Sequence, residues 1–180
     1  MKKRLSTIIL VMAILCFSVL AVASGSDEPK KETGGNGGSS SSTSKKAKDE
    51  KYSVGETAAF KNIKVTADEI IINAGSEYLE PEEGKKFVAV KFTIENISDE
   101  DQSMSSILLF DGYADDVKCD YSFSANMGLE GTLDGDVSPG KKLIGYYGVE
   151  VSKDAKVLDL EVKASWLDSG KAVFSFDIPQ

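Results

Sequence analysis

Between Gly84 and Ser98 the chain reads GKKFVAVKFTIENIS, and large hydrophobic residues occupy alternate positions through the centre of this run. The hydrophobic set is Val88, Val90, Phe92 and Ile94. Successive side chains of a β-strand point to opposite faces, so a period of two indicates a strand with one buried face. This is the longest clean alternation in the sequence, and it predicts a strand in the interior of a sheet.

The regions on both sides of this run predict further strands. On the N-terminal side these are 57–61, 63–66 and 69–73, with a bend at Ala67-Asp68, and the Glu-rich stretch 74–84 is predicted to be an exposed loop. On the C-terminal side they are 105–110, 117–123, 129–133, 142–151, 158–164 and 172–178. Turn-forming residues separate them, at Asp111-Gly112, Ser138-Pro139-Gly140 and Asp168-Ser169-Gly170.

These patterns predict an all-β domain over residues 52–180. About eight strands, with turn signals roughly every 8–12 residues and no convincing helix, are typical of an antiparallel sandwich or barrel. Alternation along each strand favours two sheets packed face to face, each with one solvated face. We therefore predict an antiparallel β-sandwich.

Residues 1–23 have the features of a secretory signal peptide. A basic start is followed by an apolar run from Thr7 to Leu20, and Ala21-Val22-Ala23 fits a cleavage site, so cleavage is expected between Ala23 and Ser24. The alternative is a retained membrane anchor, although residues 7–23 lie at the short limit for spanning a bilayer. Ser24 stands where a lipid-anchored protein has cysteine, so lipidation is not predicted.

Residues 24–51 are predicted to be a disordered linker. Gly34-Gly35-Asn36-Gly37-Gly38 runs directly into four serines. Gly/Ser-rich segments behave as flexible coil because they bury too little apolar surface to offset the entropy lost on ordering. The linker is expected to hold the domain away from a surface or to lie free in the medium.

The charge of the chain is acidic. The leader accounts for three of the 21 basic residues and none of the 29 acidic ones, so the chain after Ala23 has 18 basic residues and a net charge of −11. From Tyr52 onward, 12 Lys stand against 24 Asp and Glu, which gives −12. Such a surface repels nucleic acid and anionic lipid, and it suits cationic partners.

Missing residue types exclude several chemistries. The chain has no His, and its one Arg, Arg4, lies in the leader. A Ser–His or Cys–His nucleophile pair and a guanidinium clamp for phosphate are therefore excluded. After the leader only Cys119 remains, so an intramolecular disulfide is not expected.

Three segments together resemble a known family. They are Val54-Gly55-Glu56, the run 84–98 that ends in Glu95-Asn96-Ile97-Ser98, and Ser138-Pro139-Gly140-Lys141-Lys142 followed by Gly145 and Val149-Glu150-Val151. This pattern resembles the bacterial extracellular domain-of-unknown-function family 4352, some of whose models carry the label "telomeric repeat-binding factor 2". The resemblance covers the chain from Tyr52 to its end.

The resemblance implies an immunoglobulin-like β-sandwich, similar to a secreted mycobacterial immunogenic protein and common in surface lipoproteins of Gram-positive bacteria. It implies no catalytic residues. The telomere label implies nothing here, because a secreted domain with this acidic charge and no Arg is not expected to bind DNA.

Acidic loops are the candidate metal ligands. Asp111, Asp115 and Asp116 cluster around a glycine, and Asp134 and Asp136 flank Gly135. Oxygen-rich loops bind Ca²⁺, but neither run has the spacing of an EF-hand. Turn chemistry with solvated charge is the alternative for both.

Other residues have a candidate role and a structural alternative. Cys119, which has Asp120 beside it, is expected to pack inward as a small hydrophobe rather than act as a reactive thiol. Ser138 and Lys141 have the Ser-x-x-Lys spacing of acyl enzymes, but Pro-Gly between them favours a turn. Of Tyr146 and Tyr147, one must face outward if the strand is regular. Trp166 is the single tryptophan, and an exposed aromatic of this kind can anchor a partner.

The function expected from the sequence is non-enzymatic: binding or structural presentation at the bacterial envelope, by a secreted or cell-surface domain without a cofactor. The partner is expected to be a protein or an envelope component, bound by an exposed sheet edge or by the acidic loops. Membrane contact is expected only if the leader is retained. Two alternatives remain: a carboxylate enzyme acting on envelope glycans, and a Ca²⁺-stabilised module.

Overall fold

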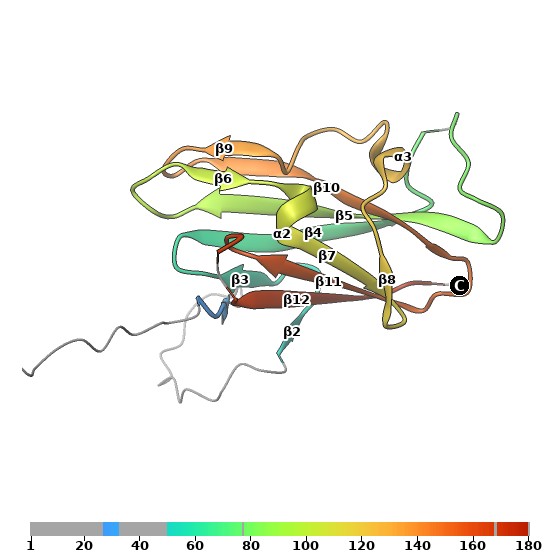
Figure 1. Ribbon diagram of the computed structural model, residues 1–180, viewed down its shortest axis with the longest axis horizontal. Coiled ribbons are helices and arrows are strands. Elements are labelled where there is room, and N and C mark those ends of the chain that lie inside the picture. Colours follow the sequence, from blue (N-terminus) through green and yellow to red (C-terminus); the bar gives the residue numbers. More distant parts are fainter. Residues whose placement is uncertain (1–26, 33–49, 77, 168, 180) are drawn as a thin grey trace, which may run out of the picture.

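The computed structural model describes residues 27–32, 50–76, 78–167 and 169–179. Two five-stranded sheets pack face to face in this part of the chain, and a two-stranded sheet lies beside them (Figure 1). The predicted all-β sandwich is confirmed. The expected signal peptide, its cleavage site at Ala23 and Ser24, and most of the expected linker lie outside the described residues.

The first sheet is built around the run quoted above. Its strand order is β1-β3-β4-β5-β10, so β5 is an interior strand, as predicted. The strands are β1 (Lys30–Glu32), β3 (Thr57–Ala59), β4 (Ile63–Ile72), β5 (Lys85–Asn96) and β10 (Lys142–Ser152). The bend expected at Ala67-Asp68 is a β-bulge within the single strand β4, where the register with β5 shifts between Ala67 and Glu69.

The second sheet has the order β2-β12-β11-β7-β8. Its strands are β2 (Lys51–Tyr52), β12 (Lys171–Asp177), β11 (Val157–Lys163), β7 (Phe110–Ala114) and β8 (Val117–Cys119). The short β2 runs parallel to β12, and the other pairs are antiparallel. Both β11 and β12 alternate between buried and half-exposed residues, which confirms the strands predicted there.

The core lies between the sheets. Phe92 from β5 meets Phe110 and Phe174 of the second sheet, with ring centroids 5.3 Å apart in both pairs. Leu160 and Phe174 are fully buried by the same alternation. Burial of each such side chain contributes about 1.5–3 kcal/mol, which makes these contacts the main force holding the sheets together.

The predicted strand over 105–110 is wrong. Helix α2 (Ser106–Leu109) occupies it, and Asp111 and Gly112 lie inside β7 instead of closing a strand. The run Ile107-Leu108-Leu109-Phe110 has no alternation, so its apolar character does not distinguish a strand from a helical turn. The Asp134 carboxylate accepts hydrogen bonds from the Ser106 backbone N–H and hydroxyl, both at 2.8 Å, which stabilises the start of the helix.

The predicted strands over 117–123 and 129–133 are also corrected. β8 ends at Cys119, and helix α3 (Phe123–Asn126) begins after Ser122, whose hydroxyl accepts from the Ala125 N–H. The strand expected at 129–133 lies instead at β9 (Gly135–Val137), which pairs with β6 (Gln102–Met104). The turn-prone Ser and Asn residues near α3 favour local side-chain hydrogen bonds over a ladder.

Part of the expected linker is structured. Lys30–Glu32 forms β1 at the edge of the first sheet, and the preceding Pro29 is buried. Ion pairs join Lys31 to Glu56 at 2.8 Å and Lys64 to Glu32 at 2.8 Å. Within the described residues, neither helix is long and apolar enough to cross a membrane.

Candidate functional site

The candidate site lies along one flank of the sandwich, where β8 ends one sheet and β10 ends the other. The two edges meet at a single bridge between Tyr121 and Val149, and the Ser122 N–H donates to the Gly148 carbonyl at 2.7 Å. An open groove of about 780 Å³ is lined by residues of β8, β10 and the chain around them. We call it the flank groove.

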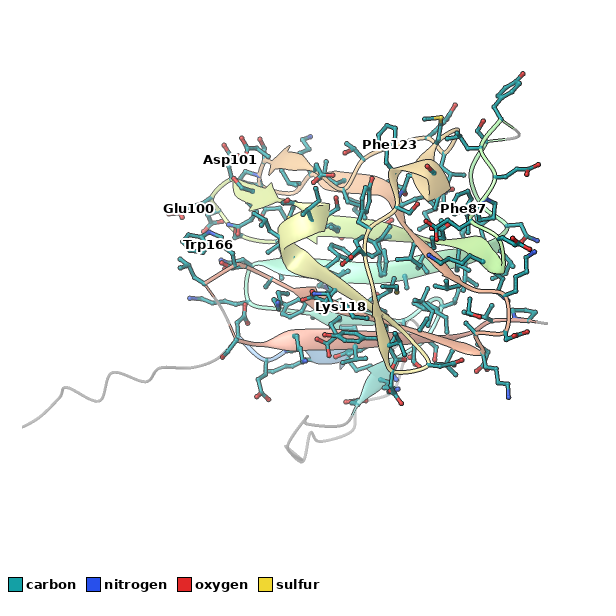
Figure 2. The ribbon with its side chains drawn as sticks, turned by 45° about the vertical axis from the view of Figure 1, so that its right-hand side comes forward. Phe87, Glu100, Asp101, Lys118, Phe123 and Trp166 are labelled. Carbon is teal, nitrogen blue, oxygen red and sulfur yellow. The ribbon has the colours of Figure 1, made fainter. Side chains whose placement is uncertain are left out.

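Apolar side chains in the flank groove are exposed to solvent. Val117 on β8 is 70% exposed and Phe123 on α3 is 71% exposed. Figure 2 labels Phe123 on α3 and Lys118 on β8. Buried Val151 and Ala155 also line the groove, so a bound chain would contact apolar surface on several sides.

Several charged groups that line the flank groove already have partners. Lys85 pairs with Glu82 at 2.6 Å and with Glu150 at 3.7 Å. The Asp115 carboxylate accepts hydrogen bonds from the backbone N–H groups of Lys156 and Val157. These groups hold the local fold, and the exposed side chains of Val117 and Phe123 remain available to a ligand.

A second cavity of about 290 Å³ adjoins the flank groove. Cys119, Asp120 and Tyr121 line both, so the two hollows share the chain segment that leaves β8. Of the residues that line this cavity, Phe110 and Tyr147 are buried, whereas Lys118 and Asp120 are exposed. We call this cavity the tyrosine well.

Burial and neighbouring carboxylates raise the pKa values of Cys119 and Tyr147 in the well. Burial, followed by the charge of Asp120, raises the pKa of the Cys119 thiol to about 11. The pKa of Tyr147 is also raised, by burial and then by nearby acidic groups that include Asp111 and Asp120. The thiol therefore stays protonated at neutral pH and is a poor nucleophile.

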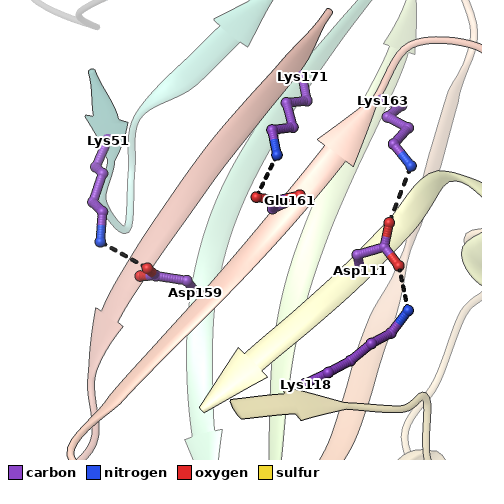
Figure 3. A network of polar contacts seen from close by, with 7 residues as sticks. All are labelled: Lys51, Asp111, Lys118, Asp159, Glu161, Lys163 and Lys171. Carbon is purple, nitrogen blue, oxygen red and sulfur yellow. Dashed lines mark hydrogen bonds and ion pairs between the residues drawn. The ribbon is translucent and has the colours of Figure 1, made fainter. Parts of the chain in front are cut away.

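The outer face of the second sheet carries a set of cross-strand ion pairs (Figure 3). Lys163 and Lys118 both bind the Asp111 carboxylate, at 3.0 and 3.1 Å, and the hydrogen bond from Lys163 is the largest cause of the lowered pKa of Asp111. Two further pairs join Lys51 to Asp159 at 2.7 Å and Lys171 to Glu161 at 2.6 Å. Surface pairs of this kind are worth about 0–1 kcal/mol each, and they keep the exposed face of the sheet polar.

The predicted Ca²⁺ ligands are not brought together. Asp111 is ion-paired with two lysines, and Asp115 binds backbone N–H groups; Asp115 and Asp116 have positive φ angles of 47° and 66°, which marks a tight turn. Asp134 binds Ser106, and Asp136 accepts from the Ser103 hydroxyl at 2.6 Å. Among the described residues, no three Asp, Glu or Cys side chains form a group that could hold a metal ion.

The other predicted residues take the places expected of structural residues or surface aromatics. Cys119 packs inward against the core. Lys141 N–H donates to the Ser138 carbonyl at 2.9 Å, a turn as expected. Tyr147 is buried, whereas the Tyr146 hydroxyl donates to Glu69 at 3.0 Å on the outer face. Trp166 is 74% exposed, next to Leu167, at the end of the sandwich that also carries Glu100 and Asp101 (Figure 2).

One structural residue was missed. Asn96 is fully buried, and its side-chain amide donates to the carbonyls of Glu100 and Val137, both at 2.7 Å. Its side-chain oxygen accepts from the backbone N–H and hydroxyl of Ser98. Asn96 lies two residues after Ile94 and therefore points to the same buried face of the strand. A polar residue at such a position needs hydrogen-bond partners, and this was the signal in the sequence that could have identified it.

At Gly145, steric crowding excludes any larger residue. A Cβ atom at Gly145 would lie 2.5 Å from the Thr132 carbonyl carbon, closer than real side chains approach. The Thr132 N–H donates to the Ile144 carbonyl at 3.0 Å, so this segment covers the edge of β10. The flank groove is the part of that edge which no such segment covers, near Glu150 and Ser152.

Comparison with protein families identifies the chain. The model of the domain of unknown function DUF4352 matches residues 52–173, and the chain belongs to this family. A search of the curated proteins found no match.

Three solved structures are similar. A "putative lipoprotein (ycdA)" from Bacillus subtilis subsp. subtilis str. 168 is 16% identical with a TM-score of 0.54; the match covers 64% of this chain and 36% of that one, so this chain spans about a third of it. The yjhA protein from Bacillus subtilis is 17% identical with a TM-score of 0.52, and the match covers 70% of this chain and 99% of that one. MPT63, a secreted protein from Mycobacterium tuberculosis, is 8% identical with a TM-score of 0.43, and the match covers 68% of this chain and 84% of that one.

Proposed function

We propose that this protein is a non-enzymatic binding module of the bacterial envelope that holds an extended segment of a partner protein in the flank groove. The observation that carries the proposal is the exposure of Val117 and Phe123 beside the free edge of β8. Such an edge adds a partner strand through backbone hydrogen bonds, while apolar side chains supply the buried contact. No cofactor and no nucleic acid are part of the proposal.

Burial of the two exposed side chains would favour binding. Covering apolar surface contributes roughly 25 cal/mol per Å², so full burial of a Val or Phe side chain is worth about 1.5–3 kcal/mol. Loss of translational and rotational freedom offsets much of this gain. The expected complex is therefore weak or transient unless other parts of the surface contribute.

The chemistry of the groove favours binding over catalysis. A carboxylate enzyme needs one acid and one base facing each other across a substrate. Three acids line the flank groove. Asp115 binds backbone N–H groups, and Glu150 accepts from the Glu82 N–H at 2.7 Å and lies near Lys85, which supports a structural role for both. Asp120 is then the one acid of the groove without such a contact among the described residues, and the reaction needs two.

In this proposal the protein is located outside the cytoplasmic membrane. The features of a signal peptide in residues 1–23 support secretion. One protein of similar fold is described as a "putative lipoprotein", which agrees with an extracellular or envelope location. The leader-cleaved and leader-retained forms both present the domain on the outer side.

Photo-crosslinking on intact cells tests the proposal. A photoreactive phenylalanine analogue is placed at Val117 or Phe123 in the flank groove and, as a matched control, at Val54, which is also an exposed apolar residue but does not line the groove. We expect a recurrent protein adduct from the two groove positions and none from Val54.

The outcomes separate the hypotheses. Equal labelling from all three positions, or none from the groove, would contradict binding in the flank groove. Capture of wall glycan alone would also contradict the proposed protein segment and would justify a hydrolysis assay. Sequencing the N-terminus of the recovered chain reports whether it begins at Ser24.

A further inference from the structure

The tyrosine well contains a buried polar group that its own fold does not satisfy. Tyr147 is 2% exposed, and its hydroxyl makes no hydrogen bond with any residue that the structure describes. That oxygen is not among the fully enclosed unpartnered atoms, so it retains access to the cavity that Tyr147 lines. Buried hydroxyls are normally hydrogen-bonded, so the Tyr147 hydroxyl is available to hydrogen-bond a molecule that enters the well.

Aromatic rings pack against the Tyr147 ring. Phe110 stacks on Tyr147 with ring centroids 5.1 Å apart and an interplanar angle of 18°, and Tyr121 lies 5.5 Å from Tyr147 at 58°. Ring faces carry negative partial charge and attract cations. The stacked pair also fixes the Tyr147 ring, so its hydroxyl is held in place before any ligand arrives.

The acidic groups of the well are not equivalent. Asp111 is neutralised by Lys118 and Lys163, as described above, whereas no described residue forms a hydrogen bond or close ion pair with the Asp120 carboxylate. Besides burial, carboxylates contribute to the raised pKa values of Cys119 and Tyr147. The charged groups that line the well are Asp111, Asp120 and Lys118, with a net charge of −1, which favours a cation.

We propose that the tyrosine well binds a primary alkylammonium group, which donates to the Tyr147 hydroxyl and the Asp120 carboxylate against the aromatic wall. A primary ammonium supplies three donors for the Tyr147 hydroxyl and the Asp120 carboxylate, and its alkyl chain fits the apolar wall of Ile107 and Phe110. A cavity of about 290 Å³ has room for a group the size of a lysine side chain. The inference rests on the proposed function, because the ammonium belongs to the partner whose segment occupies the adjoining groove.

Lys118 gives the proposal a distinctive consequence. Lys118 lines the well, its ammonium lies 3.1 Å from Asp111, and it repels an incoming cation. Removing this charge strengthens binding of an alkylammonium ion, whereas removing the charge of Asp120 weakens it. A site that bound anions would respond in the opposite sense to both changes.

The test is a titration of the purified protein with n-butylammonium chloride, followed by NMR shifts of residues in the well, with n-butanol as the uncharged probe. We expect saturable binding of the ammonium in the millimolar range and at least about tenfold weaker binding of the alcohol. Asp120→Asn is expected to weaken ammonium binding about tenfold and Tyr147→Phe about threefold, while Lys118→Gln strengthens it about threefold. Asp116→Asn, an exposed acid outside the well, is the matched control and is expected to leave binding unchanged.

Equal binding of n-butanol would overturn the proposal, because the well would then be merely apolar. Absence of saturation up to about 200 mM ammonium would overturn it as well, as would equal effects of Asp116→Asn and Asp120→Asn. Circular dichroism of each variant confirms that it is folded, and Lys118→Gln keeps the test valid if Tyr147→Phe is unstable. Crosslinking from Val117 is independent of this titration, so failure of the groove and failure of the well are distinguishable.

Discussion

The ladder between β5 and β10 and the segment from β6 to β9 are built on different principles. The ladder pairs every residue from Lys142 to Ser152 of β10 with a residue of β5. Buried and half-exposed residues alternate from Lys91 to Asn96, whereas both faces of β5 are buried from Lys86 to Val90. The segment from Gln102 to Val137 contains four short strands and two four-residue helices. Residues of this irregular segment line much of the flank groove and the tyrosine well.

This difference teaches where binding surface arises in the fold. In the ladder, alternate side chains enter the core, and the backbone N–H and C=O groups are used by neighbouring strands. In the irregular segment, apolar residues such as Val117 and Phe123 find no core position and remain exposed. The regular part supplies stability, and the irregular part supplies surface for a ligand.

The largest expected contrast between the two regions is in stability. Phe92→Ala removes a fully buried ring that contacts Phe110 and Phe174, and we expect the free energy of unfolding to fall by about 3–5 kcal/mol. Val117→Ala removes exposed atoms and is expected to change it by less than about 0.5 kcal/mol. Equilibrium urea denaturation measures both. A similar cost for the two variants would contradict the division into scaffold and binding surface.

Asn96 joins the two regions, and its removal is expected to have an intermediate effect. Asn96→Ala leaves the Val137 carbonyl without its side-chain donor and the Ser98 N–H without its acceptor, so we expect a loss of about 1–3 kcal/mol. Asp99→Ala, at an exposed position in the same loop, is the control and is expected to cost little. If both variants unfold at the same urea concentration, Asn96 does not tie the end of β5 to β9.

The smallest expected effect is a pH dependence from the irregular segment. The pKa of the Cys119 thiol is about 11 in the folded protein against an ordinary value of 9.0. Below pH 9 the thiol is protonated in both states and its contribution is constant; between pH 9 and 11 the unfolded chain releases the proton first, so stability is lost as the pH rises. Cys119→Ala is expected to make the fall in melting temperature from pH 8 to pH 10 shallower. Parallel curves for the two proteins would show that the thiol is not buried in the folded state.

Sequence reasoning succeeded where alternation is long. The strands at 142–151, 158–164 and 172–178 and the interior position of β5 follow from a period of two, which only a half-buried strand requires. It failed at 105–110, where a short apolar run does not distinguish a strand from a helical turn, and at 129–133, which is neither strand nor helix. At 117–123 a seven-residue alternation predicted a strand, but the strand ends at Cys119 and α3 follows. In these regions, contacts with distant residues, such as Asp134 at the start of α2, select the local structure.

The sites show the same limit. The inward packing of Cys119 and the opposite faces of Tyr146 and Tyr147 were predictable from local alternation. The unpartnered hydroxyl of Tyr147 was not, because the residues that line the well with it, such as Asp120 and Tyr121, come from other parts of the chain. Likewise, Asp111 binds lysines and Asp115 binds backbone N–H groups, and neighbours in three dimensions determine these contacts.

The amino-acid sequence alone therefore determines the class of fold, the interior strand and the acidic charge, and it excludes chemistries that need His or a guanidinium group in the domain. These properties depend on composition and on residues close together in the chain. The flank groove, the tyrosine well and the role of Asn96 depend on contacts between residues tens of positions apart. Only the packing of the two sheets brings those residues together, because each strand can bury its apolar face only against the other sheet.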